Sequence, residues 1–266
     1  MIGPDILALD FDGVCCDGMR EYFETSRRTH ALIWPAEPLP AAAHLEAFAA
    51  LRPVIHSGWE MPVLLHAITQ GLPRAEILGG WERIRDRLVA AGPLAGPALI
   101  DRLGQTLDRV RRDWIATDLT AWLGLHAPYG SLEELRFLVA EPDRAVLVTT
   151  KEGEFARLIL DRWDVRLADV QGKETGVHKC LNLRGLIAAW IAAHGRRPRL
   201  AFVEDRLETL QHVTTHPDLD DVALFLAEWG YNTAAARATA TGDSRIRLLT
   251  LEQFRAGTAA WPPGEV

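Results

Sequence analysis

Short apolar runs separated by helix-like segments define the pattern of this chain. Residues 5–10, which include Ile6-Leu7-Ala8-Leu9, lie between Gly3-Pro4 and Gly13. That pattern is typical of a strand buried on both faces of a sheet. Further strands are predicted at 145–149, 165–170, 200–203 and 222–226, with a sixth candidate at 247–249. Strands that alternate with helices predict a doubly wound, mostly parallel sheet, which is the Rossmann-like form of the α/β class.

The stretch from 18 to 128 follows a helical pattern instead, and no convincing strand occurs in it. Pro and Gly residues separate the helix-like segments, and Gly104 is a candidate break within the last of them. These segments are 20–34, 41–51, 59–70, 82–91 and 97–123. The sequence therefore predicts an α/β core made of 1–17 and 129–266, with an all-helical domain inserted at 18–128.

Composition narrows the classes of partner. The 266 residues carry a formal net charge of −7 and no basic run, so we expect no nucleic-acid surface. No apolar stretch approaches the ~20 residues that cross a bilayer, and the N-terminus lacks the pattern of a signal peptide. We therefore expect a cytoplasmic protein without a membrane partner, either a monomer or a homodimer.

The three cysteines form neither a disulfide framework nor a metal-ligand spacing. Cys15 and Cys16 are interpreted as buried, reduced thiols, and a redox-sensing role close to the candidate site is the alternative. His178 has no second histidine at metal-ligand spacing in the sequence, and it is assigned no role.

Polar groups follow four of the predicted strands. Asp10 and Asp12 come after the first strand, with Gly13 allowing a sharp turn just beyond them. In an open α/β sheet, ligands bind outside the carboxyl ends of the strands, so these groups are expected to converge. The groups that follow the later strands are Thr149 and Thr150, then Lys173 and Lys179, then Glu204 and Asp205.

These elements, taken in order, resemble the motifs of the haloacid dehalogenase superfamily of phosphohydrolases. The matching segments are Asp10-Phe11-Asp12-Gly13-Val14, Val148-Thr149-Thr150-Lys151, a loop lysine, and Val203-Glu204-Asp205. The helical insertion resembles the C1-type cap of the phosphoglycolate-phosphatase and phosphoglucomutase-like branch. The segments Arg52-Pro53-Val54-Ile55 and Gly58-Trp59-Glu60-Met61-Pro62 look like those of uncharacterised bacterial hydrolases of this type.

The resemblance, together with charge and geometry, implies a role for each group. Asp10 is the candidate nucleophile that forms an aspartyl-phosphate, and Asp12 is the candidate general acid and base. Mg²⁺ prefers oxygen ligands, and Asp10, the backbone carbonyl of Asp12, and Asp205 meet that need, with Glu204 as a direct or water-mediated helper. Thr149 and nearby backbone N–H groups would hold the phosphoryl oxygens.

The identity of the motif lysine stays open in the sequence. Lys173 follows Gly172, whereas Lys179 immediately precedes a predicted helix and is preferred, because the family's lysine usually lies near a helix start. The familiar Lys-Pro pair is missing, and Glu204-Asp205 replaces the commoner Gly-Asp form, so the division of metal ligation also stays open. Candidates for substrate contacts are Thr150, Arg52, His56, Trp59 and Glu60, with Arg20 and Glu21 as weaker ones.

The predicted function is Mg²⁺-dependent hydrolysis of a small phosphorylated metabolite, with the cap closing over the site. A phosphomutase on the same scaffold is the first alternative. The sequence hardly distinguishes an enzyme that transfers the phosphoryl group to water from one that returns it to the substrate. A dehalogenase needs neither a metal nor a carboxylate at the position of Asp12, so Asp12 argues against it. A non-catalytic binding or regulatory module is the remaining alternative, and no motif residue is lost that would favour it.

Overall fold

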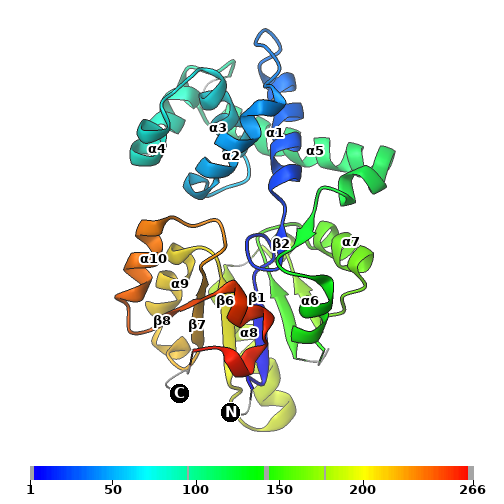
Figure 1. Cartoon of the computed structure of the whole chain (residues 1–266), viewed down its shortest axis with the longest axis vertical. Coiled ribbons are helices and arrows are strands. Elements are labelled where there is room, and N and C mark those ends of the chain that lie inside the picture. Colours follow the sequence, from blue (N-terminus) through cyan, green and yellow to red (C-terminus); the bar gives the residue numbers. More distant parts are fainter. Residues whose placement is uncertain (1–2, 95, 141–143, 177, 263–266) are drawn as a thin grey trace. The chain divides into compact units, whose positions relative to one another are not determined.

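A computed structural model describes residues 3–94, 96–140, 144–176 and 178–262 (Figure 1). The chain forms two compact units, one made of Met1–Asp17 and Ala127–Val266 and the other of Gly18–His126. The first unit contains a six-stranded parallel sheet with helices, and the second is helical. The predicted α/β class with a helical insertion is therefore confirmed.

The sheet has the strand order β5-β4-β1-β6-β7-β8, and every neighbouring pair is parallel. The chain passes from β1 to β4 and β5 on one side, and then crosses to β6, β7 and β8 on the other. The switch point of the topology thus lies at β1. The strands are β1 (Ile6–Leu9), β4 (Ala145–Val148), β5 (Asp169–Gln171), β6 (Leu200–Glu204), β7 (Ala223–Ala227) and β8 (Ile246–Leu249).

Helices cover this sheet and bury its side chains. Alternate strand residues such as Ile6, Val146 and Phe202 pack in one apolar cluster with Leu183 and Leu210 of the helices, as expected for strands whose side chains alternate between faces. The helices of this unit are α6 (Leu132–Leu138), α7 (Gly153–Trp163), α8 (Lys179–His194), α9 (Leu207–Thr214), α10 (Ala234–Thr241) and α11 (Leu251–Arg255), with short 3₁₀ helices η3 (Lys173–Thr175), η4 (Pro217–Leu219) and η5 (Thr258–Ala260).

The strand predicted at 165–170 lies later in the chain than expected. Asp164 ends α7 in the left-handed conformation, and the N–H of Val165 donates to the carbonyl of Leu160, so Val165 still belongs to the helix end. Pairing with β4 begins only at Asp169. The prediction was wrong about this start because a helix C-cap without glycine gives no strong sequence signal.

A two-stranded antiparallel pair closes the α/β unit where the helical insertion leaves and returns. Strands β2 (Cys16–Asp17) and β3 (Ala127–Pro128) pair Cys16 with Pro128 and Asp17 with Ala127. Strands of two residues are too short to give an alternation pattern, and the sequence did not predict them. Their pairing brings the two ends of the insertion together.

The helical unit contains α1 (Met19–Ile33), α2 (Leu45–Leu51), α3 (Glu60–Thr69), α4 (Arg74–Ala90) and α5 (Gly96–Leu123), with 3₁₀ helices η1 (Ala42–His44) and η2 (Arg52–Val54). Helix α1 packs against α3 and α5. A fully buried carboxylate, Glu21, joins α1 to α5: it accepts hydrogen bonds from Thr25 Oγ1 at 2.6 Å, from Arg111 Nε at 2.8 Å and from Trp122 Nε1 at 3.3 Å.

The sequence pattern predicted a break in the long helix α5 near Gly104. The helix breaks at Asp118 instead. Asp118 has φ −153° and ψ 74°, and its Oδ1 accepts a hydrogen bond from the N–H of Ala121 at 2.9 Å, which caps a new helical segment. Gly104 stays helical, because an isolated glycine lowers helix stability without preventing the helix. Helix α4 begins at Arg74, well before the predicted 82, and a non-helical Gly80 separates its two segments.

In the described part of the chain, no helix combines the length and the apolar character that crossing a membrane requires.

Candidate active site

The candidate site lies at the carboxyl ends of β1, β4 and β6. Strand β1 sits between the other two at the topological switch point, the usual place for a ligand in an open α/β sheet. The N–H of Asp10 donates to the carbonyl of Val203 at 2.9 Å, so Asp10 is fixed at the end of the β1–β6 pairing.

Asp10, Glu204 and Lys179 form a buried charge cluster. Lys179 Nζ lies 3.0 Å from Asp10 Oδ1 and 2.6 Å from Glu204 Oε2. Burial and the charge of Glu204 raise the pKa of Asp10 above its ordinary value, and burial likewise raises the pKa of Glu204. Burial alone would lower the pKa of Lys179, but attraction by Asp10 and Glu204 raises it, so the lysine stays charged between the two carboxyls.

Asp205 completes the acidic group and is held by backbone on two sides. The N–H of Tyr231 donates to its Oδ2 at 2.7 Å. Gly13 and Gly230 approach so closely that a Cβ on Gly13 would lie 2.1 Å from Asp205 Oδ2, and a Cβ on Gly230 would lie 2.3 Å from Asp205 Cβ. Gly13 also has φ +88°, so glycine is required there for conformation as well as for space.

The acidic group fits a divalent cation. One carboxylate oxygen from each of Asp10, Glu204 and Asp205 lies within 4.8 Å of the others, and all three residues are buried. Three carboxylates beside the single ammonium of Lys179 leave two negative charges when all are ionised. A buried excess of that size is costly unless a cation compensates it. Oxygen donors with this charge suit Mg²⁺.

Within that group, both carboxylate oxygens of Glu204 accept hydrogen bonds from neighbouring residues. Glu204 Oε2 accepts from Lys179, and its Oε1 accepts from the N–H of Arg206 at 3.1 Å. Both of its oxygens are therefore engaged in orienting neighbouring groups, which favours an indirect, lysine-positioning role for Glu204.

Lys151 is a site residue to which the sequence analysis gave no role. Its Nζ lies 3.1 Å from Oδ1 and 3.2 Å from Oδ2 of Asp12, and only 7% of the residue is exposed. The ion pair fixes the carboxylate of Asp12 next to the candidate nucleophile. Its position two residues beyond Thr149, at the same strand end, was the one sequence signal for it.

Thr149 is buried at the end of β4, and its Oγ1 accepts a hydrogen bond from the N–H of Lys151 at 3.2 Å. Its hydroxyl proton can therefore be donated to another oxygen. A pocket of about 240 Å³ opens beside Thr149, Thr150 and Lys179. Lys173 lines the same pocket, but its side chain is 55% exposed and its charged partner is Glu152 at 4.0 Å. The structure thus brings Lys179, and not Lys173, to Asp10.

The substrate candidates of the helical unit have contacts within that unit. Glu60 is buried and accepts from Trp81 Nε1 at 2.7 Å, with Arg85 3.6 Å away. The guanidinium of Arg85 also lies 5.8 Å from the ring centroid of Trp59. These contacts give Glu60 and Trp59 packing roles. His56 is exposed, and Arg52 is half-buried with its guanidinium 5.3 Å from the ring centroid of Tyr22.

Cys15 and Cys16 are buried beside the site, and burial raises the pKa of both thiols above the ordinary value. Nearby carboxylates, Asp10 and Asp12 for Cys15, act in the same direction. Such cysteines stay protonated and unreactive at neutral pH.

No family model matches the sequence, and no curated protein matches it. Solved structures do match. One from Lactobacillus delbrueckii subsp. bulgaricus, assigned as a phosphoglycolate phosphatase, has a TM-score of 0.61 at 11% identity and covers 98% of this chain and 100% of that one. A haloacid dehalogenase-like hydrolase from Streptococcus pneumoniae has a TM-score of 0.54 at 11% identity. The match covers 95% of this chain and 97% of that one.

A protein from Thermotoga maritima assigned as a β-phosphoglucomutase has a TM-score of 0.50 at 16% identity, covering 95% of this chain and 97% of that one. Likeness at such identities establishes the fold. The α/β fold with a helical insertion, which the sequence motifs implied, is shared with these solved structures and is therefore confirmed.

Proposed function

We propose that this chain is a Mg²⁺-dependent phosphohydrolase that cleaves a small phosphorylated metabolite through an aspartyl-phosphate. The observation that carries the proposal is the buried group of Asp10, Glu204, Asp205 and Lys179 at the switch point of the sheet. Its charge, burial and position suit phosphoryl transfer to a carboxylate better than the other chemistries considered.

Asp10 and Asp205, with the backbone carbonyl of Asp12, would hold the cation, and Glu204 would act through Lys179 or a water. Mg²⁺, when bound, would reduce the repulsion between a carboxylate and a phosphate dianion. Lys179 adds a fixed positive charge 3.0 Å from Asp10 Oδ1, and the hydroxyl of Thr149 would donate to a phosphoryl oxygen.

In the first step, an oxygen of Asp10 forms a bond to phosphorus while the bond from phosphorus to the leaving oxygen breaks. A protonated Asp12 gives its proton to that oxygen. In the second step, a water attacks the acyl phosphate, Asp12 accepts the proton of the water, and Asp10 is released as a carboxylate. Lys151, 3.1 Å from Asp12 Oδ1, keeps this carboxyl in position through both steps.

The helical unit is proposed to act as the cap. A cap that closes would exclude bulk water and select the substrate. Transfer of the phosphoryl group back to the substrate, as in a mutase, would use the same first step, so the proposed test must separate the two.

The test measures phosphate release from phosphorylated sugars, two- and three-carbon acids and nucleotides, with Mg²⁺ or with EDTA. We expect Mg²⁺-dependent release by the wild type, and a loss of at least about 10³-fold in Asp10→Asn, since a missing nucleophile removes the covalent route. Asp101→Asn, at an exposed aspartate of the helical unit, is the matched control and should retain full activity.

Release that survives Asp10→Asn would overturn the assignment of the nucleophile. A folded protein that binds Mg²⁺ and isomerises a sugar phosphate only with a bisphosphate activator would be a mutase. Binding of phosphorylated compounds without turnover would indicate a binding module.

A further inference from the structure

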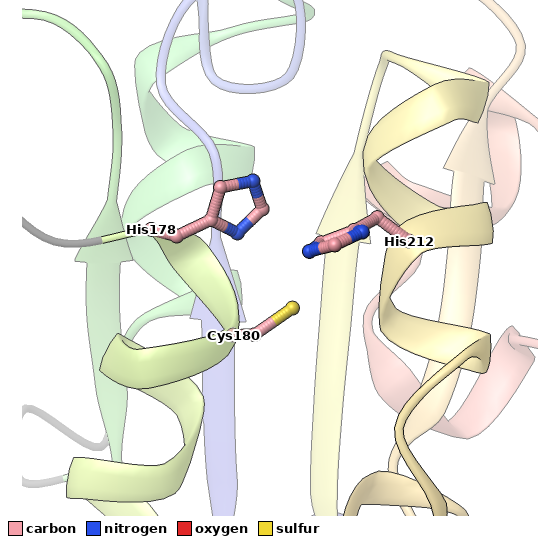
Figure 2. Close-up of side chains that lie close together, drawn as sticks. All are labelled: His178, Cys180 and His212. Atoms are coloured by element: carbon pink, nitrogen blue, oxygen red, sulfur yellow. The ribbon is translucent and has the colours of Figure 1, made fainter.

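A second group of potential metal ligands lies outside the carboxylate cluster. His178 immediately precedes α8, Cys180 is in the first turn of that helix, and His212 projects from α9. Figure 2 shows the three side chains pointing toward one another from the two helices. One nitrogen from each imidazole and the sulfur of Cys180 lie within 4.8 Å of one another.

A fourth donor is close by. His216, four residues after His212, has its Nε2 3.5 Å from Nε2 of His212. In tetrahedral zinc sites, Zn–N bonds of about 2.0–2.1 Å and Zn–S bonds of about 2.3 Å place ligand atoms roughly 3.3–3.8 Å apart. The His212–His216 separation is already in that range. The donor atoms of His178, Cys180 and His212 lie within 4.8 Å of one another, so these three would approach one another by about 1 Å on binding a metal.

The donor types indicate which metal would bind. One thiolate with two or three imidazoles suits Zn²⁺, whereas Mg²⁺ prefers oxygen ligands. Burial and the nearby imidazoles of His212 and His216 lower the pKa of His178, which favours the neutral ring that a metal needs as a ligand. Burial raises the pKa of the Cys180 thiol, which would lose its proton to solvent when the cation binds.

Ordinary packing explains part of this arrangement but not all of it. Cys180 belongs to the apolar core behind α8 and α9, and the rings of His178 and His212 contact edge to face with centroids 4.4 Å apart. However, His178 and His212 are both exposed, and apolar packing has no need of imidazoles there. Neutral imidazoles gathered around a sulfur offer lone pairs that one shared cation can bind.

We propose that His178, Cys180 and His212 form a Zn²⁺ site, with His216 as its fourth ligand. The site would join the start of α8 to α9. Its nitrogen and sulfur donors differ from the oxygen donors of the carboxylate cluster. The proposal does not depend on the proposed phosphohydrolase function. Because Lys179 lies between two of the ligands in the sequence, bound Zn²⁺ would also fix the turn that presents Lys179 to Asp10.

The test loads the full-length, metal-stripped protein with Co²⁺, a spectroscopic substitute for Zn²⁺. We expect a sulfur-to-cobalt charge-transfer band in the near ultraviolet and the visible bands of tetrahedral Co²⁺, both removed by added Zn²⁺. Carboxylates alone cannot give the sulfur band, so the readout separates this site from the Asp10 group even when both hold metal.

Cys180→Ser and His212→Ala should each abolish the sulfur band. Each should also weaken Zn²⁺ binding by more than about 100-fold, because the loss of an outer-shell partner already costs up to about 100-fold in metal affinity. Competition with a chromophoric chelator measures the affinity. His212 is exposed, so its variant remains informative if Cys180→Ser fails to fold. His194→Ala, at an exposed histidine of the same helix, is the matched control and should bind as the wild type does. Absence of the sulfur band at saturating Co²⁺, or a band that survives in Cys180→Ser and His212→Ala, would overturn the proposal.

Discussion

At the scale of single residues, the site depends on which cationic side chain faces the candidate nucleophile. Lys179 is almost fully buried between Asp10 and Glu204, whereas the side chain of Lys173 is largely exposed. A fixed charge in a water-excluded site stabilises developing negative charge far more than an exposed one does. The two lysines should therefore differ in function although both follow the same strand.

Lys179→Met should reduce kcat for the best substrate by about 10²–10³-fold, the usual effect of removing one electrostatic donor from an active site. Lys173→Met is the matched control and should change kcat little, because its charge is screened by solvent. The measurement is steady-state phosphate release by both variants. Equal losses would mean that Lys179 has no special role, and a larger loss in Lys173→Met would exchange the two assignments.

Gly13 offers a second test at this scale. Gly13→Ala must place a Cβ 2.1 Å from Asp205 Oδ2, so Asp205 has to move. We expect Mg²⁺ affinity, measured by calorimetry, to fall at least about tenfold, since displaced ligand geometry is costly for an octahedral ion.

Gly195→Ala is the control for backbone strain in that test. Gly195 has φ +68°, and nothing lies within 4 Å of its added Cβ. This variant should lose about 1–2 kcal/mol of stability from the left-handed conformation without losing Mg²⁺ affinity. An unchanged Mg²⁺ affinity in Gly13→Ala would show that the position of Asp205 does not control metal binding.

The sequence predicted those site residues that occur in ordered motifs at strand ends. It did not assign Lys151, because a lysine near a strand end has many structural uses. It also gave no sign of the His178, Cys180 and His212 group. Those residues come from two helices more than thirty positions apart in the sequence, so only the packing of α8 against α9 brings them together.

At the scale of elements, the helical unit combines its apolar packing with one buried charge network. Glu21 of α1 is fully buried and bonded to Arg111 of α5 at 2.8 Å and 3.1 Å. Glu21 is a weak substrate candidate by its place in the sequence, but its contacts make it a link between two helices. Removing one partner of such a pair leaves a buried, unpaired charge.

Glu21→Gln should therefore lower the free energy of unfolding of the helical unit by about 3–5 kcal/mol. Glu24→Gln is the matched control. Glu24 lies on the same helix and pairs with Arg28 at the surface at 3.2 Å, so its loss should cost less than about 1 kcal/mol. Urea unfolding followed by tryptophan fluorescence measures both. A similar small effect in both variants would mean that solvent reaches the Glu21 network.

Pattern-based prediction worked for elements with a long periodic signal or a buried apolar run. It succeeded for β1, β4, β6 and β7 and for the five main helices of the insertion, with ends displaced by a few residues except at the start of α4, which lies well before the predicted one. It was wrong where a single side chain decides the outcome, as at Asp118, which caps a new segment within α5. It also missed β2 and β3, whose pairing depends on residues more than a hundred positions apart.

At the scale of the whole molecule, the fold by itself does not select a reaction. Structures assigned as a phosphatase and as a mutase share this architecture with the chain at 11% and 16% identity. Function must therefore be argued from the site. In the proposed mechanism the α/β unit contains the chemistry, and the helical unit controls access and specificity. That division predicts that the two units can be separated.

The pairing of β2 with β3 shows where to make the separation. Asp17 and Ala127 are opposite each other in an antiparallel pair, so residues 18–126 can be replaced by Asn-Gly, which favours the type I′ turn of a two-residue hairpin. The apolar cluster of the sheet is formed entirely by residues of the α/β unit. We expect the shortened chain to unfold cooperatively and to bind Mg²⁺ as the full chain does.

An Ala-Ala link is the control for the turn, and it should be less stable by about 1–2 kcal/mol for each residue forced to positive φ. Removal of the helical unit should affect the hydrolysis of a small activated ester and of the natural substrate differently. Hydrolysis of p-nitrophenyl phosphate, a small activated ester, should persist in the Asn-Gly chain, whereas kcat/KM for the best natural substrate should fall sharply, because the proposed cap is gone. A shortened chain that folds and binds Mg²⁺ but retains full specificity would mean that the α/β unit alone selects the substrate. A chain that fails to fold would mean that the core depends on the helical unit for stability.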